Sequence, residues 1–353
     1  NLLSYVRANF PLDYNNFQES DFGILLVELM AAVGHIQSHK SDYLASENFL
    51  RTAKERSSVK KLLELVGVRM RGPIAAAADA SLTFTPPANV SGLTLFPDNR
   101  VVTITSPEDG GSVTYTIYKV NSDGSVDLDS NSTSLEFVFD ATTEATTISD
   151  AVLLEGALVV ESGIFASPDI VKSVRLSEFP FVEKSAQVFV QGNPETEGVY
   201  TEENNIYFAS GATDKVFQLV TDDSFRASIL FGDGTIGKSP AVGDTYTITY
   251  RVGGGTRGNV SESFINAQIG GATLKLVDSA GTVSTGVTVE NTSIATGGAD
   301  AESMVKAKRY APLTFRAQDR LVTLPDYKAF ANTFASNYGS TGKATATVRQ
   351  AFS

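Results

Sequence analysis

The run FGDGTIGKSP matches, from Gly232 to Ser239, the phosphate-binding loop pattern G-x-x-x-x-G-K-[ST]. In a nucleotide-hydrolysing enzyme this loop leads into a helix, whose N-terminal N–H groups and dipole hold the phosphates. Here Ser239 is followed by PAVGDTYTITYRV, in which Gly243 and the alternation of a strand leave no place for that helix. The run therefore favours a rigid β-connection, with Asp233 bonded to the backbone and Lys238 in solvent, over a nucleotide site.

The chain offers few other groups that could do chemistry. It has no cysteine and only two histidines, His35 and His39, which lie one turn apart on a predicted helix and could hold a metal ion. Glu28 and Asp42 are further ligand candidates by proximity in sequence, and partial burial with hydrogen bonds is the competing interpretation. We expect no catalytic residues, no metal site and no cofactor, so the chain is not predicted to be an enzyme.

Charge and hydropathy narrow the classes of partner. The formal net charge of −12 argues against non-specific nucleic-acid binding, which needs basic surface, and against direct contact with an anionic membrane. No apolar run reaches the roughly 20 residues of a transmembrane helix. The 353-residue chain begins without Met and ends inside an expected strand, which suggests an ordered fragment of a longer protein.

A basic cluster near the C-terminus has two interpretations. Its members are interspersed with Asp and Glu, so a solvated face is the default. The functional interpretation is contact with an acidic neighbouring subunit. The cluster consists of Lys306, Lys308, Arg309, Arg316 and Arg320.

The N-terminal region, residues 1–72, is predicted to be helical. A first helix is expected to begin at a Ser20–Asp21 cap, and a second over residues 53–67, so that the two form a helical hairpin. The first helix carries a near-heptad apolar stripe suited to helical partners from other chains. Burial of this stripe within the chain itself is the alternative. The stripe consists of Phe22, Leu26, Leu29, Val33, Ile36, Tyr43 and Leu50.

The rest of the chain predicts an α+β, multidomain protein. Mainly antiparallel β modules are expected over residues 73–180 and 181–298, with an α+β segment over 299–353 that is incomplete at its C-terminus. In that last segment we expect a helix broken at Pro312, a second helix with a Thr323–Asp326 capping box, and a final strand over 343–352. The clearest central strands are expected at residues 80–86, 112–120, 135–140, 186–192, 205–210, 215–220, 227–232 and 244–252.

The segment over residues 229–260, called the signature segment below, resembles the signature of the baseplate J family, the wedge proteins of contractile phage tails. The resemblance extends to the N-terminal helical region and to residues 304–331, where Gln318 replaces a commoner charged residue. The matching residues of the signature segment are Phe231, Gly232, Asp233, Gly234, Gly237, Pro240, Gly243, Tyr250, Arg251, Gly253, Gly254, Gly255, Gly258 and Asn259.

The resemblance implies a structural subunit of a myovirus baseplate wedge. Such a subunit forms the inner baseplate ring around the hub and transmits the rearrangement that triggers sheath contraction. Implied partners are a second copy of the chain, other wedge proteins, neighbouring wedges in a sixfold ring, and hub and sheath proteins. The implied location is the tail baseplate of the virion, with the host cytoplasm during assembly. The equivalent subunit of a tailocin or other contractile injection system is the alternative, with a phosphate-loop NTPase as the third hypothesis.

Overall fold

The structure is a computed structural model that describes residues 2–9, 22–128, 134–139, 144–276, 281–317, 320–336, 339–340, 344–345 and 347. The chain divides into two compact units, Asn1–Val66 and Gly67–Ser353. The predicted cap at Ser20 and Asp21 lies outside the described residues, as does most of the predicted strand over 343–352. No helix of the described part combines the length and the hydropathy needed to cross a membrane.

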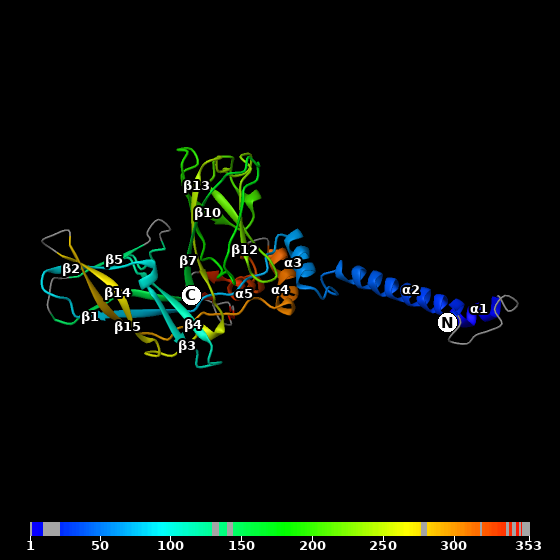
Figure 1. Cartoon of the computed structure of the whole chain (residues 1–353), viewed down its shortest axis with the longest axis horizontal. Helices are drawn as coiled ribbons and strands as arrows, with labels where there is room; N and C mark the ends of the chain where they lie inside the picture. Colours follow the sequence, from blue (N-terminus) through cyan, green and yellow to red (C-terminus); the bar gives the residue numbers. More distant parts are fainter. Residues whose placement is uncertain are drawn as a thin grey trace, which may run out of the picture. The chain divides into compact units, whose positions relative to one another are not determined.

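The first unit holds three helices among its described residues: α1 (Leu2–Asn9), α2 (Phe22–Glu47) and α3 (Arg56–Leu65). Both helices of the predicted hairpin form, but Figure 1 shows that α3 does not fold back along α2; the helix that packs on α2 is α1. The cause lies in the linker, where the buried carboxylate of Glu47 accepts hydrogen bonds from the N–H groups of Lys54 (2.7 Å) and Glu55 (3.1 Å). The end of α2 thereby sets the start of α3.

The second unit contains an eight-stranded antiparallel sheet in the order β3-β4-β6-β1-β15-β14-β2-β5 (Figure 1). Apolar side chains from every strand of this sheet form one core, with Leu82 and Phe137 among the fully buried members. The strands are β1 (Ala77–Phe84), β2 (Val90–Leu95), β3 (Val101–Thr105), β4 (Ser112–Lys119), β5 (Leu135–Val138), β6 (Thr146–Glu155), β14 (Asn266–Leu276) and β15 (Thr282–Asn291).

A seven-stranded sheet is inserted in the chain between β6 and β14, with the order β7-β13-β9-β10-β11-β12-β8. Its pairs are antiparallel except for β10 with β11, and it has a separate core around Phe217 and Ile248. The strands are β7 (Ala157–Ile164), β8 (Ser173–Arg175), β9 (Gln187–Gln191), β10 (Gly198–Glu203), β11 (Val216–Thr221), β12 (Ala227–Phe231) and β13 (Thr245–Val252).

Strand pairing does not follow the predicted boundary between residues 180 and 181. The strands β7 and β8 precede that boundary but belong to the seven-stranded sheet, while β14 and β15 follow it and complete the eight-stranded sheet. The reason is non-local pairing: β15 lies beside β1, with Ala80 opposite Asn291. Local alternation of apolar residues indicates that a strand exists, but not which partner it takes.

Two local predictions are wrong. The strand expected at 205–210 is a 3₁₀ turn, η2 (Ile206–Phe208), because the Asn205 side chain accepts a hydrogen bond from the Tyr207 N–H and caps the turn. The helix expected to break at Pro312 continues through it as α4 (Met304–Ala317). Buried Ala307 and Ala311 anchor this helix, and it packs against α5.

The C-terminal part is α+β, as expected. The helix α5 (Leu324–Thr333) begins at the predicted capping box of Thr323 and Asp326. A short pair follows, β16 (Ala335–Ser336) with β17 (Gly339–Ser340), and the Ser340 N–H donates to the Gly297 carbonyl. The remaining short elements are the 3₁₀ turns η1 (Pro97–Asn99) and η3 (Thr256–Gly258).

Candidate functional site

The phosphate-loop pattern forms a closed turn after β12, which ends at buried Phe231. The Asp233 carboxylate accepts hydrogen bonds from the N–H groups of Thr235 and Ile236, both at 2.7 Å. A Cβ added at Gly232 would lie 2.3 Å from the backbone of Gly237, so this crossing admits only glycine at position 232. The turn is built by its glycines and its aspartate.

The N–H groups that would have to face a phosphate are already used inside the protein. Those of Gly234, Gly237 and Lys238 donate to the carbonyls of Gly237 (3.0 Å), Gly211 (3.1 Å) and Asp214 (2.7 Å). No helix follows the loop; the chain turns directly into β13. This geometry does not support a nucleotide site.

Lys238 differs from its predicted solvated state. Its ammonium group lies 3.2 Å from the Glu195 carboxylate, and its side chain is 21% exposed. The pair ties the signature segment to the connection between β9 and β10. This ion pair is partly exposed, so its contribution to stability is modest.

The end of the turn is fixed by buried Asp244. Its carboxylate accepts hydrogen bonds from the N–H groups of Asn193 (2.9 Å) and Ala241 (2.7 Å) and from the Thr196 hydroxyl. Pro240 is also buried, and Gly243 adopts a φ of 93°. The predicted rigid connection is therefore anchored through backbone geometry and one carboxylate.

Tyr250 and Arg251 are consecutive residues of β13 that point to opposite faces and are both buried. Tyr250 enters the core of the seven-stranded sheet, where its hydroxyl donates to Glu161. Arg251, 1% exposed, reaches the eight-stranded sheet: its Nη1 donates to the Glu155 carbonyl at 2.8 Å, and its guanidinium lies 5.7 Å from the centre of the Tyr118 ring. Burial lowers the pKa of Arg251.

The glycine-rich tail after β13 carries the chain from one sheet to the other. Gly253, Gly254 and Gly255 have φ angles of 130°, 83° and 136°, which other residues rarely adopt. The Gly255 N–H donates to the Ile74 carbonyl at 3.1 Å. The three glycines thus let the backbone turn and approach the segment that precedes β1.

The tail ends in two further constraints. A Cβ at Gly258 would lie 2.2 Å from a carboxylate oxygen of Glu155. Asn259 exchanges hydrogen bonds with Gly298, the side-chain amide donating and its oxygen accepting, both at 2.9 Å. We call the group formed by Glu155, Arg251, residues 253–255, Gly258 and Asn259 the inter-sheet joint.

Glu155 is the residue of this joint that the sequence patterns did not single out. It is 3% exposed at the end of β6, and its Oε2 accepts the Ala76 N–H at 2.9 Å. Burial raises the pKa of Glu155 to about 7, against the opposing effects of that hydrogen bond and of the nearby guanidinium groups of Arg251 and Arg257. The sequence does contain a signal that could have identified Glu155: it is a charged residue at the end of an apolar strand, directly before Gly156.

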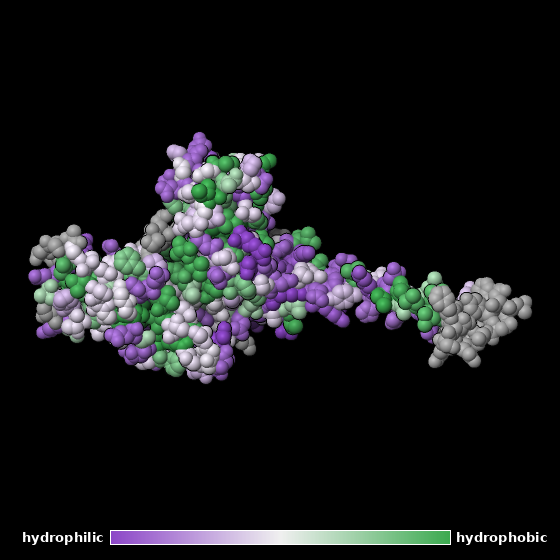
Figure 2. Space-filling model, viewed as in Figure 1, coloured by the Kyte–Doolittle hydropathy of each residue, from purple (hydrophilic) through white to green (hydrophobic). Residues whose placement is uncertain are grey.

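The predicted apolar stripe from Phe22 to Leu50, called the α2 stripe below, lies largely on the surface of the helical unit. Leu26, Leu29, Val33 and Ile36 are 40% to 64% exposed. Tyr43 and Leu50 are partly buried, and the side chain of Phe22 lies outside the described part. Figure 2 shows hydrophobic side chains at the surface of α2. Four of the seven stripe residues are therefore exposed in the part of the helical unit that the structure describes.

The exposed surface of α2 is wider than the predicted stripe. Leu25 and Met30, which were not singled out, flank the stripe on either side and are 55% and 70% exposed. The signal that could have found them was present in the sequence, because both lie one helical position from a stripe residue.

The remaining candidates do not assemble into sites. His35, His39, Glu28 and Asp42 are exposed on α2, and the described residues contain no group of three or more metal-ligating side chains. Of the basic cluster, Lys306 and Lys308 are partly exposed, while Arg309, Arg316 and Arg320 are exposed. Contact of this cluster with an acidic subunit stays a prediction.

The fold defines a multidomain α+β protein, with two sheets that the signature segment connects and a helix that exposes apolar side chains. Residues 6–65 match the family model described as the N-terminal domain of a bacteriophage baseplate protein. This match covers the helical unit that carries the α2 stripe, and it supports a structural role in a baseplate.

Comparisons with curated sequences and with solved structures do not identify a function for the chain. No curated protein sequence matches the chain. Among solved structures, the chain is similar to one from the TssK-TssF-TssG baseplate subcomplex of a type VI secretion system, at 9% sequence identity and a TM-score of 0.30, over 85% of this chain and 78% of that one. A likeness at this level carries no conclusion about function.

Proposed function

We propose that the chain is a structural subunit of a contractile phage tail baseplate wedge. It forms part of the inner baseplate ring around the hub and transmits the rearrangement that triggers sheath contraction. The observation that carries this proposal is the baseplate-domain match over residues 6–65, which coincides with the helix bearing the exposed α2 stripe. The resemblance of the signature segment to the baseplate J family supports the wedge assignment.

The exposed surface of α2 supports a helical partner. A 26-residue helix with apolar side chains in water loses the free energy that their burial would give, about 25 cal/mol for each Å² of apolar surface. Contiguous exposed apolar surface of this kind marks an interaction site. The breadth added by Leu25 and Met30 suits a bundle in which α2 contacts more than one helix. The proposed partners are a second copy of this chain and another wedge protein.

The second unit supports the mechanical part of the proposal. A subunit that passes motion between its neighbours must move as a body instead of deforming internally. The inter-sheet joint supports that property, because Arg251 of β13 bonds to the end of β6 and Gly255 bonds to Ile74, in the segment before β1. The proposed mechanism is rotation of this unit on its interfaces.

The direct test is substitution within the α2 stripe. We expect Val33→Asp to abolish co-purification of the chain with the other wedge proteins, because the charge would have to be buried in the helical bundle. The melting temperature of the second unit should stay unchanged. Ser38→Asp is the matched control, since Ser38 is exposed on the same helix outside the stripe. If Val33→Asp chains still form complete wedges in negative-stain images, the proposed seam is not the assembly surface.

A further inference from the structure

The segment that follows α3 is held to the seven-stranded sheet by ion pairs. We call residues 67–73 the strap; it is the covalent connection between the helical unit and the two sheets. The Arg69 guanidinium lies 2.5 Å from the Glu183 carboxylate and 3.4 Å from the Glu202 carboxylate. Lys184 pairs with the same Glu202 at 2.9 Å. Two cations thus face two carboxylates, and we call these four residues the Arg69 cluster.

Main-chain groups of the strap bond to the same place. The Glu183 carboxylate accepts the Gly72 N–H at 2.7 Å, and the Glu183 N–H donates to the Pro73 carbonyl at 2.9 Å. The Arg69 Nη1 also lies 3.4 Å from the carbonyl of Leu219, on β11. One carboxylate therefore holds both a side chain and the backbone of the strap.

A second set of contacts ties the strap to the C-terminal helices. The Arg71 N–H donates to the Glu302 carboxylate at 3.3 Å, and the Arg71 carbonyl accepts the Glu302 N–H at 2.9 Å. The Arg71 Nη1 donates to the carbonyl of Phe334, at the end of α5, at 3.4 Å. Met70 lies between the two arginines and is 3% exposed. Opening of the strap would have to break these bonds and expose Met70.

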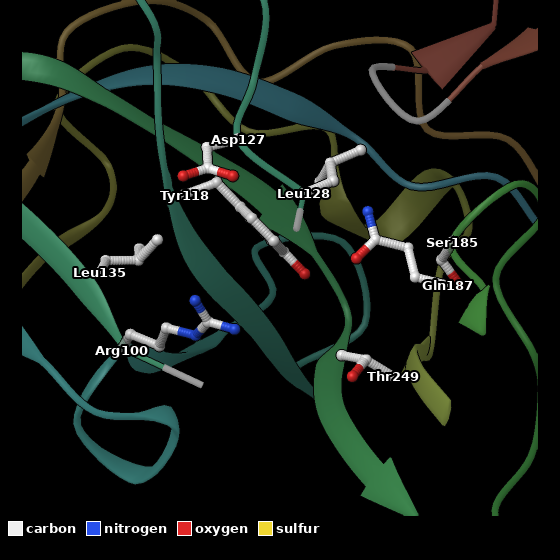
Figure 3. Close-up of a pocket in the computed structure, with 8 residues that line it drawn as sticks. All are labelled: Arg100, Tyr118, Asp127, Leu128, Leu135, Ser185, Gln187 and Thr249. Carbon is white, nitrogen blue, oxygen red and sulfur yellow. The ribbon is translucent and has the colours of Figure 1, made fainter. Parts of the chain in front are cut away.

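The turn that receives the strap is itself anchored. Glu183 and Lys184 precede β9, and the hydroxyl of the next residue, Ser185, accepts the Arg251 N–H of β13 at 3.1 Å. Figure 3 shows Ser185 next to Gln187, the first residue of β9, where both line one side of a small cavity. The carboxylate side of the Arg69 cluster is thus fixed to the sheet, and the strap is the side that can move.

Two backbone features suit a strap with an alternative position. Lys184 has a φ of 59°, a left-handed conformation that residues other than glycine rarely adopt, so the closed arrangement carries local strain. Gly67, at the start of the strap, has a φ of 75°, and among the described residues no atom lies within 4 Å of a Cβ built there. The backbone can therefore pivot at Gly67 without collision.

We propose that the strap is a conformational latch, closed in this structure by the Arg69 cluster, which opens as a unit while both sheets stay folded. A pull transmitted along the chain from the helical unit meets the Arg69 ion pairs before it meets either sheet. The latch thereby sets how much of that pull the seven-stranded sheet receives. Its part in a rearranging baseplate rests on the proposed function, whereas its opening is a property of the isolated chain.

Hydrogen exchange of the full chain, unsubstituted and as Glu183→Gln, tests the latch. The substitution keeps an oxygen for the Gly72 N–H but removes the charge that pairs with Arg69. We expect exchange of the Arg71, Gly72 and Glu302 amides to accelerate together, by about tenfold, because these N–H groups are released when the strap opens. The Tyr250 amide of β13 should keep its rate, since the sheet stays folded.

The matched control is Glu178→Gln. Glu178 is an exposed carboxylate on the same connection between β8 and β9, and its substitution should leave every one of these amides unchanged. Unchanged exchange of the Gly72 amide in Glu183→Gln overturns the proposal. Equal acceleration of the Gly72 and Tyr250 amides also overturns it, because the strap would then open only when the sheet unfolds.

Arg69→Lys covers the case in which Glu183→Gln does not fold. This variant keeps the positive charge but loses the forked guanidinium that reaches Glu183 and Glu202 together. We expect the strap amides to exchange about threefold faster, and an unchanged rate overturns the proposal. Because these measurements use the chain without partners, their failure leaves the wedge proposal standing, and failure of the Val33→Asp test leaves the latch standing.

Discussion

Glu155 and Arg251 illustrate how single residues hold the two sheets together. The guanidinium of Arg251 donates a hydrogen bond to the main-chain carbonyl of Glu155. The Glu155 carboxyl group accepts a hydrogen bond from the Ala76 N–H. Both side chains are buried, and burial disfavours the charged form of each. The joint therefore relies on backbone hydrogen bonds, and the ionisation of its carboxyl makes it sensitive to pH.

Glu155 gives a pH-dependent stability with a definite sign. Its pKa rises from 4.5 to about 7 on folding, so between these values the folded state keeps a proton that the unfolded chain has released. The free energy of unfolding should therefore fall as pH rises through this window, by on the order of 3 kcal/mol. Glu155→Gln keeps the acceptor for Ala76 and should lack this fall.

Denaturant unfolding of both proteins from pH 4 to pH 8 measures the effect. The stability of Glu155→Gln relative to the unsubstituted protein should increase with pH and level off above about pH 7. A stability difference between the two proteins that stays constant from pH 4 to pH 8 would contradict the prediction. It would show that the Glu155 carboxyl ionises in the folded state as it does in water.

The crossing at Gly232 gives a second prediction at the residue scale. In Gly232→Ala the new Cβ would lie 2.3 Å from the Gly237 backbone, so the turn must open, at a cost of about 2 kcal/mol or more. Gly211→Ala is the control, because no atom lies within 4 Å of a Cβ at that position. Equal unfolding midpoints for the two variants would contradict the close crossing.

At the scale of the elements, the carboxylate of Glu47 fixes the connection between α2 and α3 through hydrogen bonds. The Glu47 carboxylate accepts hydrogen bonds from the N–H groups of Lys54 and Glu55, and Glu55 is the residue directly before α3. The Tyr43 hydroxyl donates to the Glu55 carboxylate at the same place. This arrangement fixes where the long helix ends, and it separates the exposed surface of α2 from the buried side chains of α3.

Glu47→Ala should loosen that linker. Removing a carboxylate that accepts hydrogen bonds from these N–H groups lowers the stability of the linker by about 1 kcal/mol. Hydrogen exchange of the Lys54 and Glu55 amides should accelerate by roughly fivefold, which is that free energy expressed as a rate. Glu28→Ala, at an exposed position of the same helix, should leave both amides unchanged. Unchanged exchange in Glu47→Ala would mean that other contacts fix the linker.

The sequence predicts the elements better than their arrangement. The sequence patterns correctly indicate the strands β9, β12 and β13, and the Thr323–Asp326 capping box correctly indicates the start of α5, because these signals are local. The pairing of β1 with β15 and the insertion of one sheet into the other depend on contacts between distant residues. For the same reason Glu155 was missed, although the glycines around it belong to a recognisable motif.

At the scale of the whole molecule, the two units suit different tasks. The second unit has two cores joined by the signature segment, which favours movement as one body. The helical unit matches a baseplate domain and exposes apolar side chains. A rigid part and an associating part are what a subunit of a rearranging ring requires.

The measurement that tests the central claim most directly is a cryo-EM map of the particle assembled with this chain. We predict that the chain lies in a ring around the hub of a contractile tail baseplate, with the α2 stripe packed against helices of a second copy and of another wedge protein. A map in which the chain lies outside the baseplate, or in which the stripe faces solvent, would contradict the account.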